Sequence, residues 1–412
     1  MNTGIVKSKA SGLALMGKVL VGMVVLGAGI VPQGAKAAAT DPQFFQYFQT
    51  VCNVMVVPPN WDAANLALVC FSTDILSGGA SAGSYFSANL GAVNAGSGAA
   101  SRKKNGIRVQ LDEQEEKKGK GASADGSGWG LLVTPQYGKS DRPETIKENG
   151  YQSTLTGLVV GLDYRFSDSF VLGLAVGQTK DKATFLNNVG FQNSSSNIAT
   201  MYGTWLISEN SAVDGYLGYG KLKLENQRYF VASPTISGTM SGNTTGQQTM
   251  AGLSVSHQSA VGRFSLAPSF NLDYIKTTIK SYNESGIGNN PYFTFLALHY
   301  GDRSVTSLTS SLGGRLSTSY GYDWGALIPS MRLAAVHEFQ NKSRQLSNEL
   351  VLTPGSGFSV ETDSPDCNYL NIGLGVTAAM NGGAQLFLDY EKRTQDKLLR
   401  SWAVSLGGLF EF

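Results

Sequence analysis

The sequence is poor in charged residues and in histidine. Asp, Glu, Lys and Arg make up 15% of its 412 residues, whereas typical soluble domains carry about 25%. The formal net charge of +2 becomes −2 when the four lysines within residues 1–37 are left out. A chain so close to neutral is a poor match for the phosphate backbone of DNA or RNA, so no nucleic-acid partner is expected.

Long apolar runs are also missing beyond the first residues. After Val31 no run of 18 apolar residues occurs, which excludes a spanning helix from the mature chain because such a helix needs about 20. The apolar run 19–31 is itself too short, follows three lysines and precedes the small residues Ala35 and Ala37. This layout is typical of a secretory signal peptide. We expect residues 1–37 to be removed by cleavage between Ala37 and Ala38, and any membrane role to use β-strands.

Cysteine is scarce as well, with three in the chain. Cys52 and Cys70 stand on either side of two prolines, and apolar residues before and after that break fall near helical spacing. We expect residues 38–76 to form a short helical segment stapled by a Cys52–Cys70 disulfide, with two free buried thiols as the alternative. A metal site is not expected there, because residues 38–125 contain no histidine and no third cysteine.

Residues 77–128 have the composition of a linker. Positions 77–101 are mostly Gly, Ala, Ser and Asn, and positions 102–120 then hold eleven charges of both signs. The charged stretch fits a solvated face, a water-lined channel or disorder, and residues 107–112 alternate as a short strand would.

From Trp129 to Phe412 the sequence reads as amphipathic strands separated by turns. Connections after even-numbered strands are brief, whereas those after odd-numbered strands, at 139–152, 181–194, 229–246, 282–303 and 341–367, are long and polar. Only 394–397 departs from this alternation, which is typical of an outer-membrane barrel with an even strand count. Twelve strands are predicted at 129–138, 153–166, 169–180, 195–208, 211–228, 247–259, 261–281, 304–319, 324–340, 368–380, 383–393 and 398–412.

Side-chain alternation within these strands predicts the two faces of the wall. In the second strand Leu158, Val160 and Leu162 share one face, and Asp163 and Arg165 occupy the other. A midplane Arg or Lys facing lipid costs roughly 2–4 kcal/mol, so the polar face should line the lumen. We expect small inward residues, Gly157, Gly161 and Gly173, to leave lumen space. The fold class is therefore all-β, a 12-stranded antiparallel transmembrane β-barrel preceded by a short helical and linker segment.

Residues 129–412 resemble the β-domain of monomeric autotransporters of type V secretion. The resemblance rests on Gly-Leu-Asp-Tyr-Arg-Phe-Ser-Asp at 161–168, followed by Leu-Gly-Leu-Ala-Val-Gly at 172–177, and on Pro-Ser-Met-Arg-Leu at 329–333 leading to His-Glu-Phe at 337–339. It covers about 70% of the chain. Family members usually carry a passenger of several hundred residues, whereas here only residues 38 to about 125 precede the barrel.

The resemblance implies how the chain is assembled and used. It implies a segment that threads the lumen just before the first strand, where the linker stands. It also implies that the barrel-assembly machinery recognises an alternating apolar last strand, here Trp402, Val404, Leu406, Phe410 and Phe412. Expected partners are outer-membrane lipid, the general secretion machinery and this assembly machinery, and the expected state is a monomer in a Gram-negative outer membrane.

No motif predicts catalysis, and no cofactor is expected. The Gly-Ala-Ser-Ala-Gly match at 79–83 lies in the linker, where composition alone produces it. His299 with Asp302 is the best remaining candidate pair, although a solvated loop histidine is the simpler interpretation. The chain is therefore not expected to be an enzyme.

Charged lumen residues are the remaining candidates for a site. Strand alternation places Arg332 and Glu338 on the lumen side of the wall, as it does Asp163 and Arg165 of the second strand. We expect Arg332 and Glu338 either to be solvated charges or to contact the threaded linker. The leading hypothesis is an outer-membrane translocator that supports export or surface display of residues 38–76. The alternatives are a barrel plugged by its N-terminal module and a pore for small solutes.

Overall fold

The computed structural model describes residues 128–145, 147–233, 236–288, 297–351, 354–355, 357–381 and 383–411. The predicted signal peptide with its Ala37–Ala38 cleavage site, the helical segment with Cys52 and Cys70, and the linker up to residue 127 lie outside the described residues, as does Phe412. Within the described part, no helix has the length and apolar character needed to cross a membrane.

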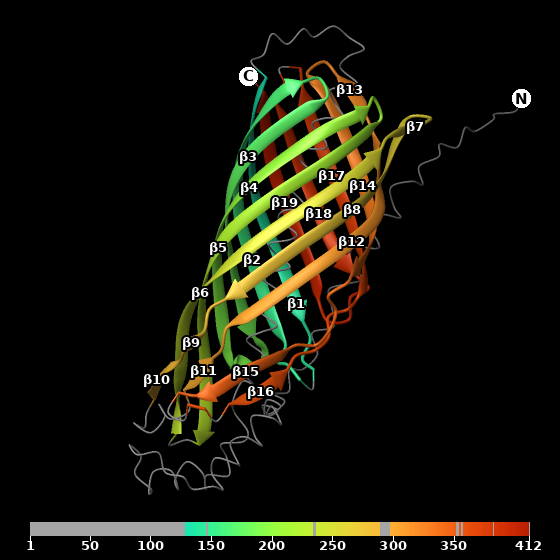
Figure 1. Cartoon of the computed structure of the whole chain (residues 1–412). Coiled ribbons are helices and arrows are strands. Elements are labelled where there is room, and N and C mark those ends of the chain that lie inside the picture. The colour runs from blue at the N-terminus through green and yellow to red at the C-terminus, as the bar shows by residue number, and fades with distance from the viewer. Residues whose placement is uncertain are drawn as a thin grey trace, which may run out of the picture. The chain divides into compact units, whose positions relative to one another are not determined.

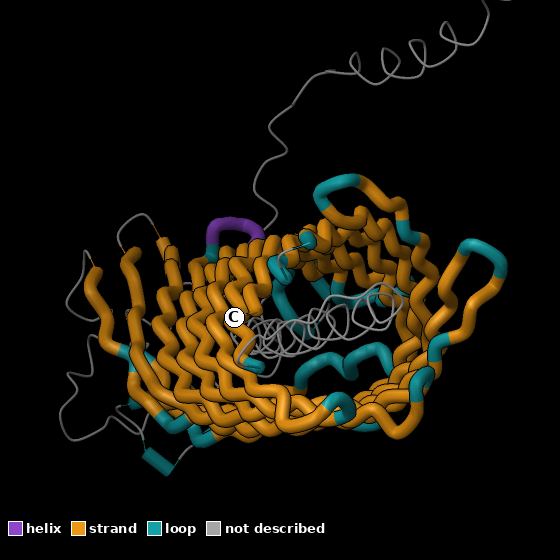
Figure 2. Tube along the Cα trace, turned by 90° about the horizontal axis from the view of Figure 1, so that it is seen from above, coloured by secondary structure: helices purple, strands orange, loops and turns teal. Residues whose placement is uncertain are grey.

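Twelve long antiparallel strands of the described part form one closed sheet, as predicted (Figures 1 and 2). Closure is complete because β1 pairs with β19 and β6 pairs with β8. Their bounds are β1 Trp129–Arg142, β2 Tyr151–Ser167, β3 Phe170–Phe185, β4 Gly190–Ser208, β5 Ser211–Ser233, β6 Ile236–His257, β8 Phe264–Ile279, β12 Arg303–Thr318, β14 Gly325–Glu338, β17 Asn368–Met380, β18 Gln385–Thr394 and β19 Arg400–Glu411.

The connections divide the barrel into two unlike ends. The end with the short connections holds the start of β1, the end of β19 and the small strands β7 (Ser259–Val261) and β13 (Tyr320–Tyr322), and we call it the turn end (Figure 1). At the opposite end, the loop end, lie the long loops and a short 3₁₀ helix, Leu186–Asn188. The predicted segregation of short and long connections is therefore present.

Two of the predicted long loops are nevertheless mostly strand, and that part of the prediction is wrong. β5 runs to Ser233 and β6 starts at Ile236, so the segment 229–246 continues the wall instead of leaving it. The segment 181–194 behaves in the same way, because β3 runs to Phe185 and β4 starts at Gly190, whereas most of the predicted loop 139–152 lies between β1 and β2. The apolar alternation stops earlier than the strands because their outer faces become polar near the loop end, as at the exposed Lys221 and Lys223.

The long loops 282–303 and 341–367 form a second sheet, which we call the end sheet. Its strands are β9 (Tyr282–Asn283), β11 (Leu298–Tyr300), β15 (Gln345–Leu350) and β16 (Phe358–Glu361), while β10 (Ser285–Gly288) extends β6. A buried apolar cluster holds the end sheet together: Tyr282, Leu298, Tyr300, Leu346, Leu350, Phe358 and Val360.

The end sheet crosses the loop end of the barrel. On one side Glu284 forms an ion pair with Arg228 of β5, and on another side Asp363, which follows β16, pairs with Arg142 of β1. β5 and β1 lie four strands apart around the ring. The two ion pairs therefore attach the end sheet at two separate points of the wall, and the sheet lies across the loop end (Figure 1).

The outer face of the wall is apolar over the middle of the strands. On β3, Leu174 and Val176 are 66% and 64% exposed, whereas Val171 and Ala175, on the other face, are 5% and 4% exposed. Aromatic rings flank this apolar band. Trp129, Tyr164, Phe166 and Phe170 form a chain of ring contacts at the turn end, and Tyr137, Tyr390 and Trp402 gather nearer the loop end.

The inner face is mixed and less polar than the alternation predicted. It carries buried carboxylates and amides, but also a buried apolar cluster: Val159, Ala175, Tyr202, Tyr216, Met250, Ile275 and Val305. The wall therefore buries apolar surface on its inner side as well as presenting apolar surface outside.

Candidate functional site in the barrel wall

A row of six residues crosses the inner wall from β2 to β8. Tyr202 of β4 lies opposite Tyr216 of β5, and the two rings lean in opposite directions along the row. The Tyr202 hydroxyl donates a hydrogen bond to Asp163 of β2 (2.8 Å), and that of Tyr216 donates one to Asp273 of β8 (2.9 Å). Each bond joins two strands that are separated by a third.

A glycine on the intervening strand makes room for each tyrosine ring. A Cβ on Gly173 of β3 would lie 2.4 Å from the Cζ of Tyr202, and a Cβ on Gly252 of β6 would lie 2.1 Å from the Cε1 of Tyr216. The space that Gly173 was expected to leave in the lumen is therefore filled by a tyrosine ring, and that expectation is wrong. We call this arrangement, in which a long side chain passes over a glycine to reach a carboxylate, a glycine bridge.

Arg332 forms a third glycine bridge on the other side of the barrel. Its guanidinium leaves β14, passes over Gly373 of β17 and reaches β18, where Nη2 lies 2.6 Å from Oδ1 of Asp389 and 3.9 Å from Oε2 of Glu391. A Cβ on Gly373 would lie 2.7 Å from that nitrogen. The described partners of Arg332 are thus acids of the wall.

The other predicted lumen charges also have partners in the wall. Arg165 of β2 lies 3.8 Å from Glu411 of β19, across β1. Glu338 accepts hydrogen bonds from the Ser307 hydroxyl and from the backbone amides of Leu308 (3.0 Å) and Gln340 (2.8 Å). Contacts of Arg332 or Glu338 with the linker fall outside the described residues.

The predicted assembly residues that the structure describes lie on the outer face of β19. Leu406 and Phe410 are among the exposed large apolar residues, and the Trp402 ring lies between those of Tyr137 on β1 and Tyr390 on β18. Val404 is half-buried beside them.

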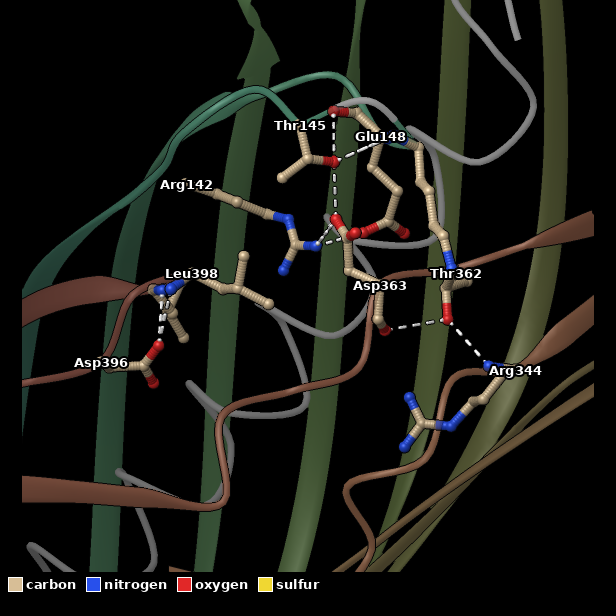
Figure 3. Close-up of polar contacts among 10 residues, drawn as sticks. Arg142, Thr145, Glu148, Arg344, Thr362, Asp363, Asp396 and Leu398 are labelled. Carbon is tan, nitrogen blue, oxygen red and sulfur yellow. Dashed lines mark hydrogen bonds and ion pairs between the residues drawn. The ribbon is translucent and has the colours of Figure 1, made fainter. Parts of the chain in front are cut away.

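At the loop end Arg142 of β1 joins two carboxylates from different loops (Figure 3). It contacts Glu148 in the β1–β2 loop and lies 3.0 Å from Asp363, which also accepts a hydrogen bond from the Thr145 hydroxyl (2.7 Å). Burial raises the pKa of Glu148 to about 8. Burial therefore favours the neutral form of Glu148, whereas Asp363, the second acid in contact with Arg142, is less buried.

Further charged residues surround a small cavity of about 50 Å³ beneath these loops, lined among others by Glu338, Arg344, Arg393 and Asp396. Asp396 accepts hydrogen bonds from the amides of Leu398 (3.0 Å) and Leu399 (2.8 Å) and forms an ion pair with Arg393. These contacts tie the β18–β19 loop down, and they place no nucleophile beside a base.

The histidines do not assemble a catalytic pair. His299 contacts Asn283 (2.5 Å), while the Asp302 carboxylate accepts a hydrogen bond from the Ser281 amide (2.6 Å). His257 and His337 contact Ser211 and Asn368. Among the described residues, no group of three or more His, Cys, Asp and Glu side chains is arranged to hold a metal ion. The Gly-x-Ser-x-Gly match at 79–83 lies outside the described residues.

Comparison of sequences relates the barrel to known proteins. The family model of the autotransporter β-domain matches residues 131–391. Lipase 1 of Photorhabdus luminescens is 26% identical over 254 residues, which cover 61% of this chain and 37% of that relative. Outer membrane protein A of Rickettsia conorii is 26% identical over 268 residues, covering 61% of this chain and 12% of the relative. The chain thus spans well under half the length of these relatives, and the lipase similarity is confined to the barrel region.

Two solved structures share the fold. The translocator domain of the autotransporter NalP from Neisseria meningitidis superimposes with a TM-score of 0.55 at 14% identity, covering 77% of this chain and 98% of that domain. The β-domain of the Bordetella autotransporter BrkA gives 0.51 at 16% identity, covering 69% and 100%. With the family model matched over most of the barrel, the chain belongs to the autotransporter β-domain family, and its described part is a translocator barrel of the Gram-negative outer membrane.

Proposed function

We propose that the barrel supports export and surface display of its own short N-terminal segment, residues 38–76. The observation that carries the proposal is that β1 begins at the turn end of a closed barrel. In outer-membrane barrels short turns face the periplasm. The segment that precedes β1 therefore approaches the barrel from the periplasm, the compartment to which a signal peptide would deliver it.

The length of the linker is compatible with a path through the barrel. β1 has 14 residues and, at a tilt of ~40°, rises about 35 Å along the barrel axis. The predicted linker has about 50 residues, which would span ~75 Å even if fully helical. Residues 38–76 can therefore reach the loop end while residue 128 stays at the turn end.

The closing strand supports the proposed partners. The outer face of β19 carries exposed apolar residues, which suits recognition by the barrel-assembly machinery, and the predicted signal peptide suits the general secretion machinery. Because β1 and β19 pair with each other, neither leaves an open edge for a second copy. We therefore propose a monomer, and we assign it no catalytic role.

The end sheet favours one alternative, a barrel whose outer mouth is closed and whose N-terminal segment stays inside as a structural plug. The contacts of Arg228 with Glu284 and of Arg142 with Asp363 hold that sheet across the loop end. Display requires that residues 38–76 pass through the barrel before the end sheet folds, or that they pass through a gap beside that sheet.

Protease accessibility on intact cells distinguishes the two proposals. A protease site is inserted within residues 40–76, and matched copies of the same site are placed in the β4–β5 turn, at 209–210, and in the β15–β16 loop, at 354–355. Display predicts cleavage at the N-terminal site and at 354–355 but not at 209–210. Protection of the N-terminal site, with cleavage at 354–355 preserved, would contradict display and support the plug.

A further inference from the structure

Four lysines gather on the outside of the wall near the loop end. Lys180 and Lys182 lie on β3, Lys221 and Lys223 lie on β5, and all four side chains are exposed. Among the described residues, none of them forms an ion pair with a carboxylate. We call this set the basic patch.

β4, which runs between the two lysine strands, carries small polar residues facing the same way. Strand register places Ser195 directly between Lys180 and Lys223, and Asn193 beside Lys182. Together these residues line a hollow of about 540 Å³. Two acids also line the hollow: Glu225, which accepts a hydrogen bond from Asn193 (3.3 Å), and Asp181, which is buried. The three lysines of the hollow, Lys180, Lys182 and Lys223, therefore exceed its acids by one charge.

The basic patch begins where the apolar band ends. Phe170 and Lys180 lie ten residues apart on β3, and ten residues of a strand tilted by ~40° rise about 25 Å, the usual height of the apolar band of an outer-membrane barrel. On β3 no exposed large apolar residue follows Val176, and on β5 Tyr219 is the last one before the lysines, with Tyr229 beyond them. The lysines therefore lie at headgroup depth, on the side away from the turn end.

The same row of the wall continues the positive charge around the barrel. On one side, Thr154 of β2 separates Lys139 of β1 from Lys182 of β3. On the other side, Lys139 pairs with Trp402 of β19, and Trp402 in turn pairs with Lys392 of β18. An aromatic ring flanked by cations at the membrane boundary is a common anchoring arrangement for headgroups.

We propose that the basic patch binds the phosphate groups of an anionic glycolipid in the outer leaflet. A lipid is favoured over a soluble anion because the hollow adjoins the apolar band, so one molecule can place its acyl chains on Val176 and Tyr219 and its phosphates among the lysines. Lysine ammonium groups on long stems suit phosphate as mobile point charges, and each such cation near an anionic surface adds to the attraction.

Lipid capture by the reconstituted full-length barrel tests this proposal. The protein is placed in phosphatidylcholine nanodiscs doped with bisphosphorylated lipid A, and the lipid A retained per barrel is measured by native mass spectrometry. The test variant is K180Q/K182Q/K221Q/K223Q. The matched control, K342Q/K397Q, removes two exposed loop lysines outside the patch. A third variant replaces all four patch lysines with arginine and so keeps the charge.

We expect the glutamine variant to bind lipid A about tenfold more weakly or worse, and the control and arginine variants to bind like the wild type. Added salt should weaken wild-type binding. Dephosphorylated lipid A should bind weakly to every variant, and inorganic phosphate without acyl chains should not compete at millimolar concentration.

Equal retention by the wild type and the glutamine variant would overturn the proposal, as would equal binding of phosphorylated and dephosphorylated lipid. Competition by free phosphate would replace the lipid with a soluble anion and would also overturn it. If the fourfold variant does not fold, K180Q/K223Q, which flanks Ser195 alone, carries the same comparison. None of these readouts depends on export of the N-terminal segment.

Discussion

Removing the Arg332 guanidinium should destabilise the barrel more than removing its main partner, Asp389. Arg332→Gln leaves the carboxylates of Asp389 and Glu391 on the inner wall without their shared cation. Asp389→Asn leaves Arg332 with Glu391 still 3.9 Å away. The two single variants therefore differ in how much charge they leave uncompensated.

The distances set the expected magnitudes. Coulomb attraction falls with distance, so Glu391 at 3.9 Å supplies roughly two thirds of the attraction that Asp389 supplies at 2.6 Å. All three side chains are more than four-fifths buried, and breaking a buried pair costs about 3–5 kcal/mol. We expect about 3 kcal/mol for Arg332→Gln and about 1 kcal/mol for Asp389→Asn.

Reversible urea unfolding of the barrel in detergent micelles measures these differences as a double-mutant cycle. The double variant should cost clearly less than the sum of the single variants, with a coupling of about 1–3 kcal/mol. Gly373→Ala should reduce this coupling, because its Cβ would displace the guanidinium. Strict additivity, or a larger cost for Asp389→Asn than for Arg332→Gln, would refute the reasoning.

Three further outcomes are expected. Gly252→Ala should cost about 1–3 kcal/mol by overpacking against the Tyr216 ring, and most of that cost should disappear in a Tyr216→Leu background; an unchanged cost there would be inconsistent with ring displacement. Because the pKa of Glu148 is raised from 4.5 to about 8, the folded state holds its proton more tightly, so this residue should lower stability as pH rises from 4.5 to 8; the stability difference between Glu148→Gln and wild type should grow over that window in thermal unfolding scans. Arg228→Met should cost about 3–5 kcal/mol because it leaves the Glu284 carboxylate buried without its cation, and the double variant Arg228→Met/Glu284→Gln should recover part of that loss by the same scans.

The twelve strands were predictable because lipid imposes a contrast that survives in the sequence. Outward positions such as Leu174 and Val176 must be apolar, and their inward neighbours need not be. The contrast fades near the loop end, where outward positions become lysine and serine, so the extensions of β5 and β6 were missed. The end sheet was missed because its strands are short and pair over long separations, as β11 does with β15.

The candidate site could be predicted only in part. Parity was enough to select Arg332 and Asp163 as inward-facing charges, but their partners lie two strands away and depend on register between strands. Tyr202 and Tyr216 were missed for the same reason, since a tyrosine in a barrel sequence is equally compatible with a membrane girdle. One signal was present: each bridging side chain shares a row with a glycine on the next strand.

A nitroxide scan along β3 of the reconstituted barrel tests the central claim most directly. Single cysteines are introduced from 171 to 182 into a variant lacking the native cysteines, and collision rates with oxygen and with a polar nickel complex are measured. We predict high oxygen access at 172, 174 and 176, low access at 173 and 175, and a change to nickel access at 180 and 182. A scan without this two-residue period, or with nickel access at 174 and 176, would contradict a closed barrel that presents its apolar face to lipid.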